Sequence, residues 1–162
     1  MLMFMKILLS TIMLVLFVGC DNKKGTFIET VQSQNSHEVS TQNLKMLIKN
    51  KGLRLFHLID HKSNADAVKM NLKPETVIVF GNPKMGTTLM NCNSSMGLEL
   101  PLRILVSTDY EGITTFSYTN PEYWSLKHNI KDKQCLAILI KAKTALHNLC
   151  KAASQRPPKA NK

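Results

Sequence analysis

Hydrophobic and polar residues form short blocks along the chain, and these blocks predict alternating strands and helices. β-Branched, aromatic and aliphatic residues favour strands at five places. The expected strands cover residues 27–31, 53–61, 76–80, 102–107 and 113–118. The run at 76–80 is almost continuously apolar, which indicates a buried strand, and the turn at 108–112 predicts an antiparallel return.

Helical signals lie between these strands. Asn35 and Glu38 stand three residues apart, as in a capping box, and Gly52 is placed to end the helix that follows them. Shorter helical segments are expected at three further places, 63–71, 84–96 and from Asn120, where Asn120 would be the N-cap and Pro121 the first residue.

The longest helix is predicted near the C-terminus, from Lys133 to about Ala153, with Asp132 as its cap. Apolar residues recur there at alternating steps of four and three, which is typical of a helix with one buried side. The expected buried positions are Cys135, Leu139, Ala142, Leu146, Leu149 and Ala153, with Leu136, Ile140 and Cys150 widening the stripe. The order of strand, helix, four strands and final helix predicts an α+β domain.

The first 25 residues have the pattern of an export signal. Lys6 precedes an uncharged run at 7–19, which is shorter than the ~20 residues that a membrane-spanning helix needs. The sequence Phe17-Val18-Gly19-Cys20, followed by polar residues, resembles the lipobox of bacterial lipoproteins, in which the cysteine is acylated. A buried apolar helix and an uncleaved anchor are the alternatives.

The lipobox resemblance implies a signal peptide at 1–19, a lipidated Cys20 and a tether to residue 25. The protein would be exported and anchored by its lipid to a membrane. It would face the periplasm from the inner or outer membrane, or lie at the cell surface. A single acyl chain binds a membrane only marginally, so stable attachment would need several chains.

Length and charge limit the number of domains and the classes of binding partner. A chain of 162 residues fits one domain of ordinary size. It has 21 Lys and Arg against 11 Asp and Glu, a net charge of +10, and loss of Lys6 with the signal peptide leaves +9. The basic residues are scattered, and the densest group is Lys151, Arg156, Lys159 and Lys162 near the C-terminus. We expect the tail at 154–162 to be disordered. Because we expect the protein to be exported, we expect this positive charge to interact with a membrane surface rather than with nucleic acid.

Three cysteines remain if Cys20 carries lipid, so at least one thiol must be unpaired. Cys135 and Cys150 fall on one predicted helix at a separation of ~22 Å, whereas a disulfide needs Cα atoms within ~7 Å. Cys92 lies between polar residues and is expected to be an accessible thiol. The sequence has no C-x-x-C motif and no Cys/His spacing of the zinc-binding type, and no motif indicates a cofactor.

His57, Asp60 and His61 are candidates for binding or acid–base chemistry. On a strand the two histidines would share a face at a separation of ~13 Å, too far apart to hold one metal ion. The simplest interpretation places His57 on the sheet and uses Asp60 and His61 to end the strand and cap the next turn. A ligand site that uses Asp60 and His61 is the alternative, and a metal site is less favoured.

The segments Gly81-Asn82-Pro83 and Gly86-Thr87 stand where a strand passes into a helix. Backbone N–H groups at such a place attract phosphates, but a turn with an N-cap explains the same residues. The Walker pattern is absent, so nucleotide hydrolysis is not supported, and no G-x-S-x-G indicates a serine hydrolase.

Several short motifs, taken in their order, resemble the bacterial family known as domain of unknown function 302 (DUF302). They are Phe56–His61, Gly81–Thr87, Met90, Gly97–Leu102 and Tyr118–Tyr123. The resemblance implies that residues 26–153 form an α+β domain in which a curved antiparallel sheet packs against helices, similar to the TATA-binding-protein fold. It singles out Asp60 and His61, with Asn82 and Glu99 nearby, as a ligand site, and it implies no activity. The family usually carries Asp where Glu99 stands.

We therefore expect a membrane-anchored lipoprotein whose domain is a small-ligand-binding or accessory module of the cell envelope rather than an enzyme. No catalytic or metal-binding residue is assigned. The alternative is a metal- or redox-linked envelope protein that uses His57, His61 and Cys92. A third class is an oligomeric scaffold, such as a homodimer.

Overall fold

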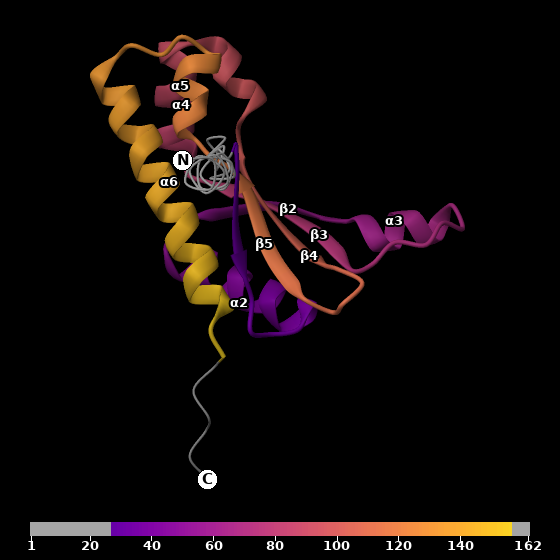
Figure 1. The fold of residues 1–162 in the computed structure, drawn as a ribbon. Helices are drawn as coiled ribbons and strands as arrows, with labels where there is room; N and C mark the ends of the chain where they lie inside the picture. The colour runs from indigo at the N-terminus through magenta and orange to yellow at the C-terminus, as the bar shows by residue number, and fades with distance from the viewer. Residues whose placement is uncertain (1–26, 157–162) are drawn as a thin grey trace, which may run out of the picture.

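Five antiparallel strands form one sheet in the computed structural model, which describes residues 27–156 (Figure 1). The strands are β1 (Ile28–Gln32), β2 (Arg54–Asp60), β3 (Glu75–Gly81), β4 (Leu102–Thr108) and β5 (Thr114–Thr119). Their order in the sheet is β1-β5-β4-β3-β2, so β4 is central and β1 and β2 are the edges. The predicted signal peptide, Cys20, the tether and the end of the tail lie outside the described residues.

Helices join the strands and cover one face of the sheet. They are α2 (His37–Asn50), α3 (His61–Ala67), α4 (Pro83–Cys92), α5 (Glu122–Lys127) and α6 (Lys133–Ser154), with a 3-10 helix η1 (Ser94–Leu98) after α4. In Figure 1, α2 and α6 pack beside the sheet, and α3 projects from the far end of the β2–β3 pair. The α+β fold with a long C-terminal helix is therefore confirmed.

Two clusters of buried side chains make up the core. The larger lies between the sheet and the two long helices and includes Leu44 and Ile48 of α2, Phe80 of β3 and Leu146 of α6. The smaller lies under α4, η1 and α5, around Trp124. Within residues 27–156, no helix combines the length and the apolar character that crossing a membrane requires.

The predicted boundaries of α6 are confirmed almost residue for residue. The Asp132 carboxylate accepts a hydrogen bond from the Cys135 N–H (2.9 Å) and so caps the helix. All six positions of the predicted core stripe are buried, but Ile140 is 55% exposed, so the stripe is narrower there than we expected. Ser154 is buried as the last residue of α6, so the helix continues into the start of the predicted tail.

The start of α2 differs from the expected capping box. Ser36, not Asn35, is the N-cap, and its hydroxyl accepts from the Val39 N–H (3.4 Å). The Asn35 amide instead donates to the carbonyl of Gln155 (2.9 Å), just beyond the end of α6. A tertiary contact has replaced the local one, because Asn35 lies where α2 and α6 meet.

The single helix predicted over 84–96 is two helices. Asn93 is extended, with φ −158°, so α4 ends at Cys92. The Asn93 side chain then accepts from the Ser95 N–H (2.9 Å) and begins η1. A side chain that caps the following turn competes with continuation of the helix, which is the usual behaviour of asparagine.

Candidate ligand-binding site

An apolar cavity of about 460 Å³ lies where the sheet meets α4 and α6. Its wall is built from the start of β2, the end of β3, the start of β4, one side of α4 and the middle of α6. Apolar side chains dominate the lining, among them Phe56, Phe80, Met85, Leu102, Ile138 and Leu149. The volume falls within the range of about 300–1,000 Å³ that small-molecule sites occupy.

Asn82 turns the chain from the sheet into the wall of this cavity. Its side-chain oxygen accepts hydrogen bonds from the N–H groups of Lys84 (3.0 Å) and Met85 (3.3 Å), and Pro83 occupies the first turn of α4. This arrangement fixes the direction of α4, whose Met85 and Leu89 then line the cavity. The interpretation of this segment as a turn with an N-cap is confirmed.

Two cationic side chains belong to the cavity wall. The guanidinium of Arg54 lies 5.0 Å from the centroid of the Phe56 ring, and Lys141 comes from α6 on the other side. Within residues 27–156 neither cation has a carboxylate within ion-pair distance, and no Asp or Glu lines the cavity. The cavity therefore combines an apolar interior with uncompensated positive charge.

A shallower hollow adjoins the cavity. It shares Lys141 and Ala145 with the cavity and adds Lys51, Ile140, Thr144 and Asn148. Lys51 and Asn148 can donate hydrogen bonds to a ligand, whereas the Thr144 hydroxyl already donates to the Ile140 carbonyl (3.1 Å). The apolar cavity thus adjoins a mixed surface that carries two lysines.

Asp60 and His61 have local roles. The Asp60 carboxylate accepts from the Ser63 N–H (2.9 Å) and caps α3, of which His61 is the first residue. His57 lies on the edge strand β2 and is exposed. The interpretation that Asp60 and His61 end a strand and begin the next turn is confirmed.

The expected convergence of Asp60 and His61 with Asn82 is wrong. In the antiparallel register, Asp60 pairs with Thr76 and Arg54 pairs with Gly81, so Asp60 and Asn82 belong to opposite ends of β3. Five residues of strand separate these ends, about 17 Å. Of the four residues singled out, Asn82 alone lines the cavity. Ligand binding by Asp60 and His61 stays a prediction.

Glu99 lies in a buried polar cluster of its own. Its Oε1 accepts from the Lys127 ammonium (2.7 Å) and lies 3.0 Å from Nε2 of His128, which is 95% buried. Burial alone would raise the pKa of Glu99, but the hydrogen bonds and charges of Lys127 and His128 outweigh it and hold the pKa below its ordinary value. The ionised carboxylate can only accept, so Nε2 of His128 carries the donated proton.

A serine completes this cluster. The Ser95 hydroxyl lies 2.6 Å from Nδ1 of His128, which gives a hydroxyl, an imidazole and a carboxylate in succession. The N–H and the hydroxyl of Ser95 also bond to Asn93, and Asn93 donates to the His128 carbonyl (2.8 Å). Ser95 does not line the cavity. The cluster joins η1 to the end of α5, and no spacing in the sequence indicated it.

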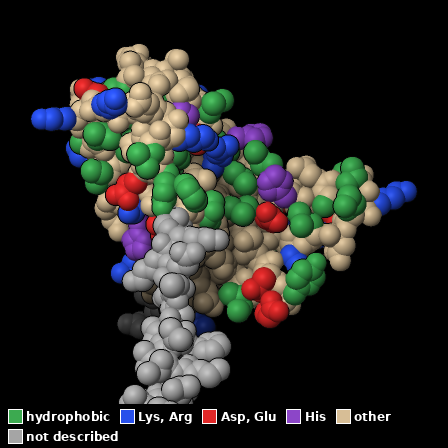
Figure 2. All heavy atoms as spheres, turned by 45° about the horizontal axis from the view of Figure 1, so that its top comes forward, with side chains coloured by type: hydrophobic (Ala, Val, Ile, Leu, Met, Phe, Trp, Pro, Cys, Tyr) green, Lys and Arg blue, Asp and Glu red, His purple; other side chains and the backbone are tan. Residues whose placement is uncertain are grey.

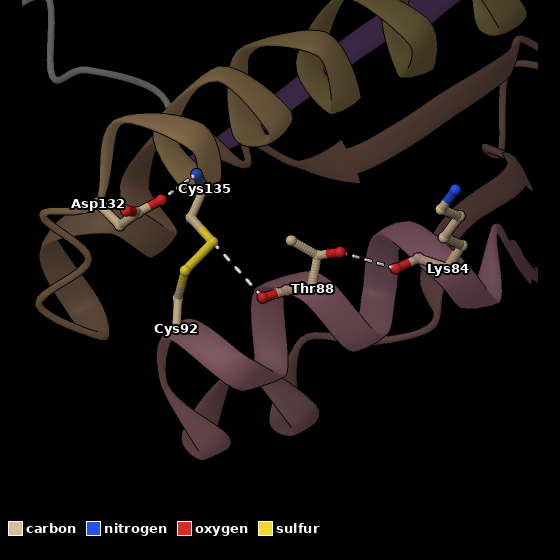
Figure 3. Close-up of a disulfide and its surroundings, with 5 residues drawn as sticks. All are labelled: Lys84, Thr88, Cys92, Asp132 and Cys135. Carbon is tan, nitrogen blue, oxygen red and sulfur yellow. Dashed lines mark hydrogen bonds between the residues drawn. A yellow bond between two sulfur atoms is a disulfide. The ribbon is translucent and has the colours of Figure 1, made fainter.

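A disulfide between Cys92 and Cys135 joins the end of α4 to the first turn of α6 (Figure 3). The expectation of an accessible Cys92 thiol is therefore wrong, because its sulfur is bonded. Cys150 is the unpaired cysteine among these three, and burial raises the pKa of its thiol to about 12. The inference that at least one thiol is unpaired is confirmed.

The structure does not bring His57, His61 and Cys92 together. Among residues 27–156, the one group of three close metal-ligating side chains is Cys92, Asp132 and Cys135, which includes no histidine. Thiolates rather than disulfides bind metals, so the two sulfurs are not ligands while they are bonded to each other.

On the face drawn in Figure 2, Lys and Arg side chains are spread out, with acidic and apolar side chains between them. This face therefore has no continuous basic track of the kind that binds a nucleic acid. The expected scatter of basic residues is confirmed for this face.

Comparisons with known proteins agree with this fold. The family described as "Domain of unknown function DUF302" matches residues 29–153. The crystal structure of an uncharacterized conserved DUF302 protein from Bacillus stearothermophilus superposes with a TM-score of 0.71 at 17% identity. The match covers 79% of this chain and 98% of the Bacillus chain. At this identity the likeness shows the fold.

Three curated relatives are named as fluoride-specific ion channels. FluC 1 of Brucella suis and FluC 1 of Brucella abortus are each 31% identical to this chain over 101 residues, or 62% of its length. The chain spans 40% of the first and 37% of the second. The similarity therefore concerns less than half of those proteins.

Proposed function

The chain belongs to the DUF302 family, and from this premise we propose that it is an exported lipoprotein whose domain binds a small, largely apolar ligand. The binding site is the cavity between α4, α6 and the sheet. Protein interiors are normally close-packed, with few voids larger than a water molecule. A cavity of about 460 Å³ with an apolar lining is therefore the observation that carries the proposal.

Burial of an apolar ligand supplies the driving force. Each Å² of apolar surface removed from water contributes about 25 cal/mol. A ligand in the cavity would contact α4, α6 and the sheet together. The ligand needs no covalent chemistry from the protein, which is consistent with a binding rather than a catalytic module.

Lipid on Cys20 would hold this domain close to a membrane. From Cys20 to Ile28, where β1 begins, an extended chain reaches at most about 28 Å. The tether lets the domain approach the membrane to within a Debye length, about 8 Å, where the net charge of the exported chain favours anionic lipid headgroups. A short tether and a basic surface support a domain that meets its ligand at or near the bilayer.

The curated relatives support a role beside membranes. Part of each FluC protein is similar to this domain, and a channel works in a membrane. We infer that the domain of this chain serves as a binding or accessory module at a membrane. Fluoride itself does not match a cavity whose lining is mainly apolar.

The binding proposal is tested by closing the cavity. Ala145 is an exposed residue of α6 that lines the cavity, so Ala145→Trp places an indole at its entrance without disturbing the core. We expect binding of the apolar fluorophore N-phenyl-1-naphthylamine to fall at least tenfold. Ala137→Trp, at an exposed position of the same helix outside the cavity, is the control and should bind like the wild type. Equal binding by the two variants would refute the site.

Anchoring is tested separately in a bacterial host. Metabolic labelling with palmitate should modify the wild-type chain and not Cys20→Ser, and the variant should leave the membrane fraction. Unlabelled wild-type protein would refute the lipoprotein assignment and leave the cavity proposal unaffected.

A further inference from the structure

We infer that the ligand is a single-chain amphiphile with an anionic head group, whose chain fills the cavity and whose head lies against Arg54 and Lys141. This inference rests on the proposed function, because it assigns the chemistry of the ligand in that cavity. It follows from three features of the site: the apolar interior, the two unpaired cations, and the adjoining hollow with the donors Lys51 and Asn148.

The interior favours one hydrocarbon chain. Side chains from three strands and two helices line it, and no carboxylate is among them. Its volume of about 460 Å³ stands in the lower part of the range for small-molecule sites, which suits one chain better than a two-chain lipid.

The Arg54 guanidinium is placed to meet a head group. It lies over Phe56, 5.0 Å from the ring centroid, and Phe56 lines the same cavity. Among the hydrogen bonds of residues 27–156, the Arg54 side chain donates none. Guanidinium groups have five donors in a planar fork that fits carboxylate and phosphate oxygens.

Lys141 places a second positive charge on the opposite wall. It lines both the cavity and the adjoining hollow, where Lys51 and Asn148 offer further donors. By contrast, Lys127 and Lys143 are both paired with glutamates. Within the described part of the chain, Arg54 and Lys141 thus have no intramolecular ion pair that would compete with a head group.

The test compares head groups on one chain length. Decanoate and decyltrimethylammonium, each below its critical micelle concentration, and 1-decanol below its solubility limit are titrated by calorimetry into the exported chain, residues 20–162. A DUF302 chain of little more than this domain has been crystallised, so a domain of this extent folds on its own. We expect decanoate to bind about tenfold more tightly than decanol, and the ammonium compound to bind most weakly.

The hydrocarbon chain of the ligand is tested by varying its length. From octanoate to decanoate to dodecanoate, each added methylene should lower the Kd about fourfold until the cavity is full. Raising the salt concentration should weaken the binding of decanoate and leave the binding of decanol unchanged, because salt screens the exposed charges around the head group.

Variants then locate the head group. Arg54→Gln and Lys141→Gln should each weaken the binding of decanoate about tenfold and leave the binding of decanol unchanged. Lys151→Gln, at an exposed position of α6 outside the cavity, is the control and should change neither affinity. All three positions are exposed, and circular dichroism verifies that each variant is folded.

The outcomes separate this inference from the proposed function. Equal affinity for decanol and decanoate, tighter binding of the ammonium compound, or no effect of either Gln variant would overturn the anionic head group while leaving the cavity as a binding site. Failure of decanol, decanoate and the fluorophore alike to bind would overturn the proposed function as well.

Discussion

Glu99 places a carboxylate that is 6% exposed beneath η1, where its charge needs donors from the protein. Lys127 and His128 supply them from the end of α5. A buried charge that loses such partners is strongly destabilising, so this cluster holds η1 against α5 as long as Glu99 is ionised.

The Glu99 cluster predicts acid sensitivity. Because the folded pKa of Glu99 is lower than the unfolded value near 4.3, ionisation contributes stability above that value, and the contribution is lost as pH falls through the folded pKa. At pH 7, Glu99→Gln should lower the free energy of unfolding by about 1–3 kcal/mol. Lys127 is 62% exposed, so most of this loss should come from the contact with His128. Urea unfolding at a series of pH values from 7 to 3 measures the free energy of unfolding of the wild type and of Glu99→Gln.

The difference between wild type and Glu99→Gln should shrink as the pH falls from the unfolded pKa, near 4.3, through the lower folded pKa, because the carboxyl takes up a proton first in the unfolded chain and then in the folded one. Glu111→Gln, at an exposed turn, is the matched control and should follow the wild type at every pH. A constant gap between wild type and Glu99→Gln down to pH 3 would contradict a lowered pKa.

Cys150 is expected to be unreactive in the folded protein. It is fully buried, and burial raises the pKa of its thiol to about 12, so the thiolate that reacts with iodoacetamide is scarce at pH 8. Peptide mapping after alkylation should find Cys150 unmodified in native protein and modified after unfolding in urea. Rapid native labelling would show that the end of α6 opens readily.

The residues whose roles could be inferred from sequence are those that act locally. Asp60 and Asn82 cap helices within three residues of themselves, and Asp132 does the same for α6. Glu99 stood out through a family motif, but its partners are 28 and 29 residues away. A sequence pattern holds no information on such a contact until the fold brings the segments together.

At the level of elements, the Cys92–Cys135 disulfide ties together the two helices that form the cavity walls. Cys92 ends α4 and Cys135 begins α6, and the Cys135 sulfur also lies 3.5 Å from the Thr88 carbonyl (Figure 3). The pairing could not be predicted, because the two cysteines belong to separate helices 43 residues apart. We expect the disulfide to limit how far α4 moves from α6.

Removal of the disulfide should weaken the domain. For a closed loop of 43 residues, the chain-entropy estimate is about 4 kcal/mol. The double variant Cys92→Ala/Cys135→Ala should therefore unfold at a lower urea concentration, and reduced wild-type protein should behave similarly. An unchanged midpoint after either treatment would show that the disulfide does not constrain the unfolded chain.

Helix boundaries followed from sequence wherever a local signal set them. The start of α6 and the end of α2 before Gly52, which has a positive φ of 65°, were both predicted. The break between α4 and η1 was missed, because Asn93 could have continued the helix or capped the next one. Its amide contact with His128, on another element, favours the break.

On the scale of the whole molecule, the cavity unites segments that are far apart in the chain. Leu53 and Leu149 both line it although 96 residues separate them. The antiparallel order places the start of β2, the end of β3 and the start of β4 at one end of the sheet, where α4 leaves and α6 crosses. Individual strands were predictable, but their order was not, and the cavity depends on that order.

A ligand that bridges these segments should stabilise all of them together. Ligand that binds only the folded state raises the free energy of unfolding by about 2.7 kcal/mol at one hundred times its Kd. Decanoate should therefore raise the Tm of the wild type by several degrees, in proportion to the logarithm of its concentration. The same ligand should leave the Tm of Ala145→Trp unchanged while still raising that of Ala137→Trp. Because the cavity walls include segments from β2 to α6, the shift should appear as one cooperative transition. A Tm that rises equally in both tryptophan variants would place the ligand elsewhere on the domain.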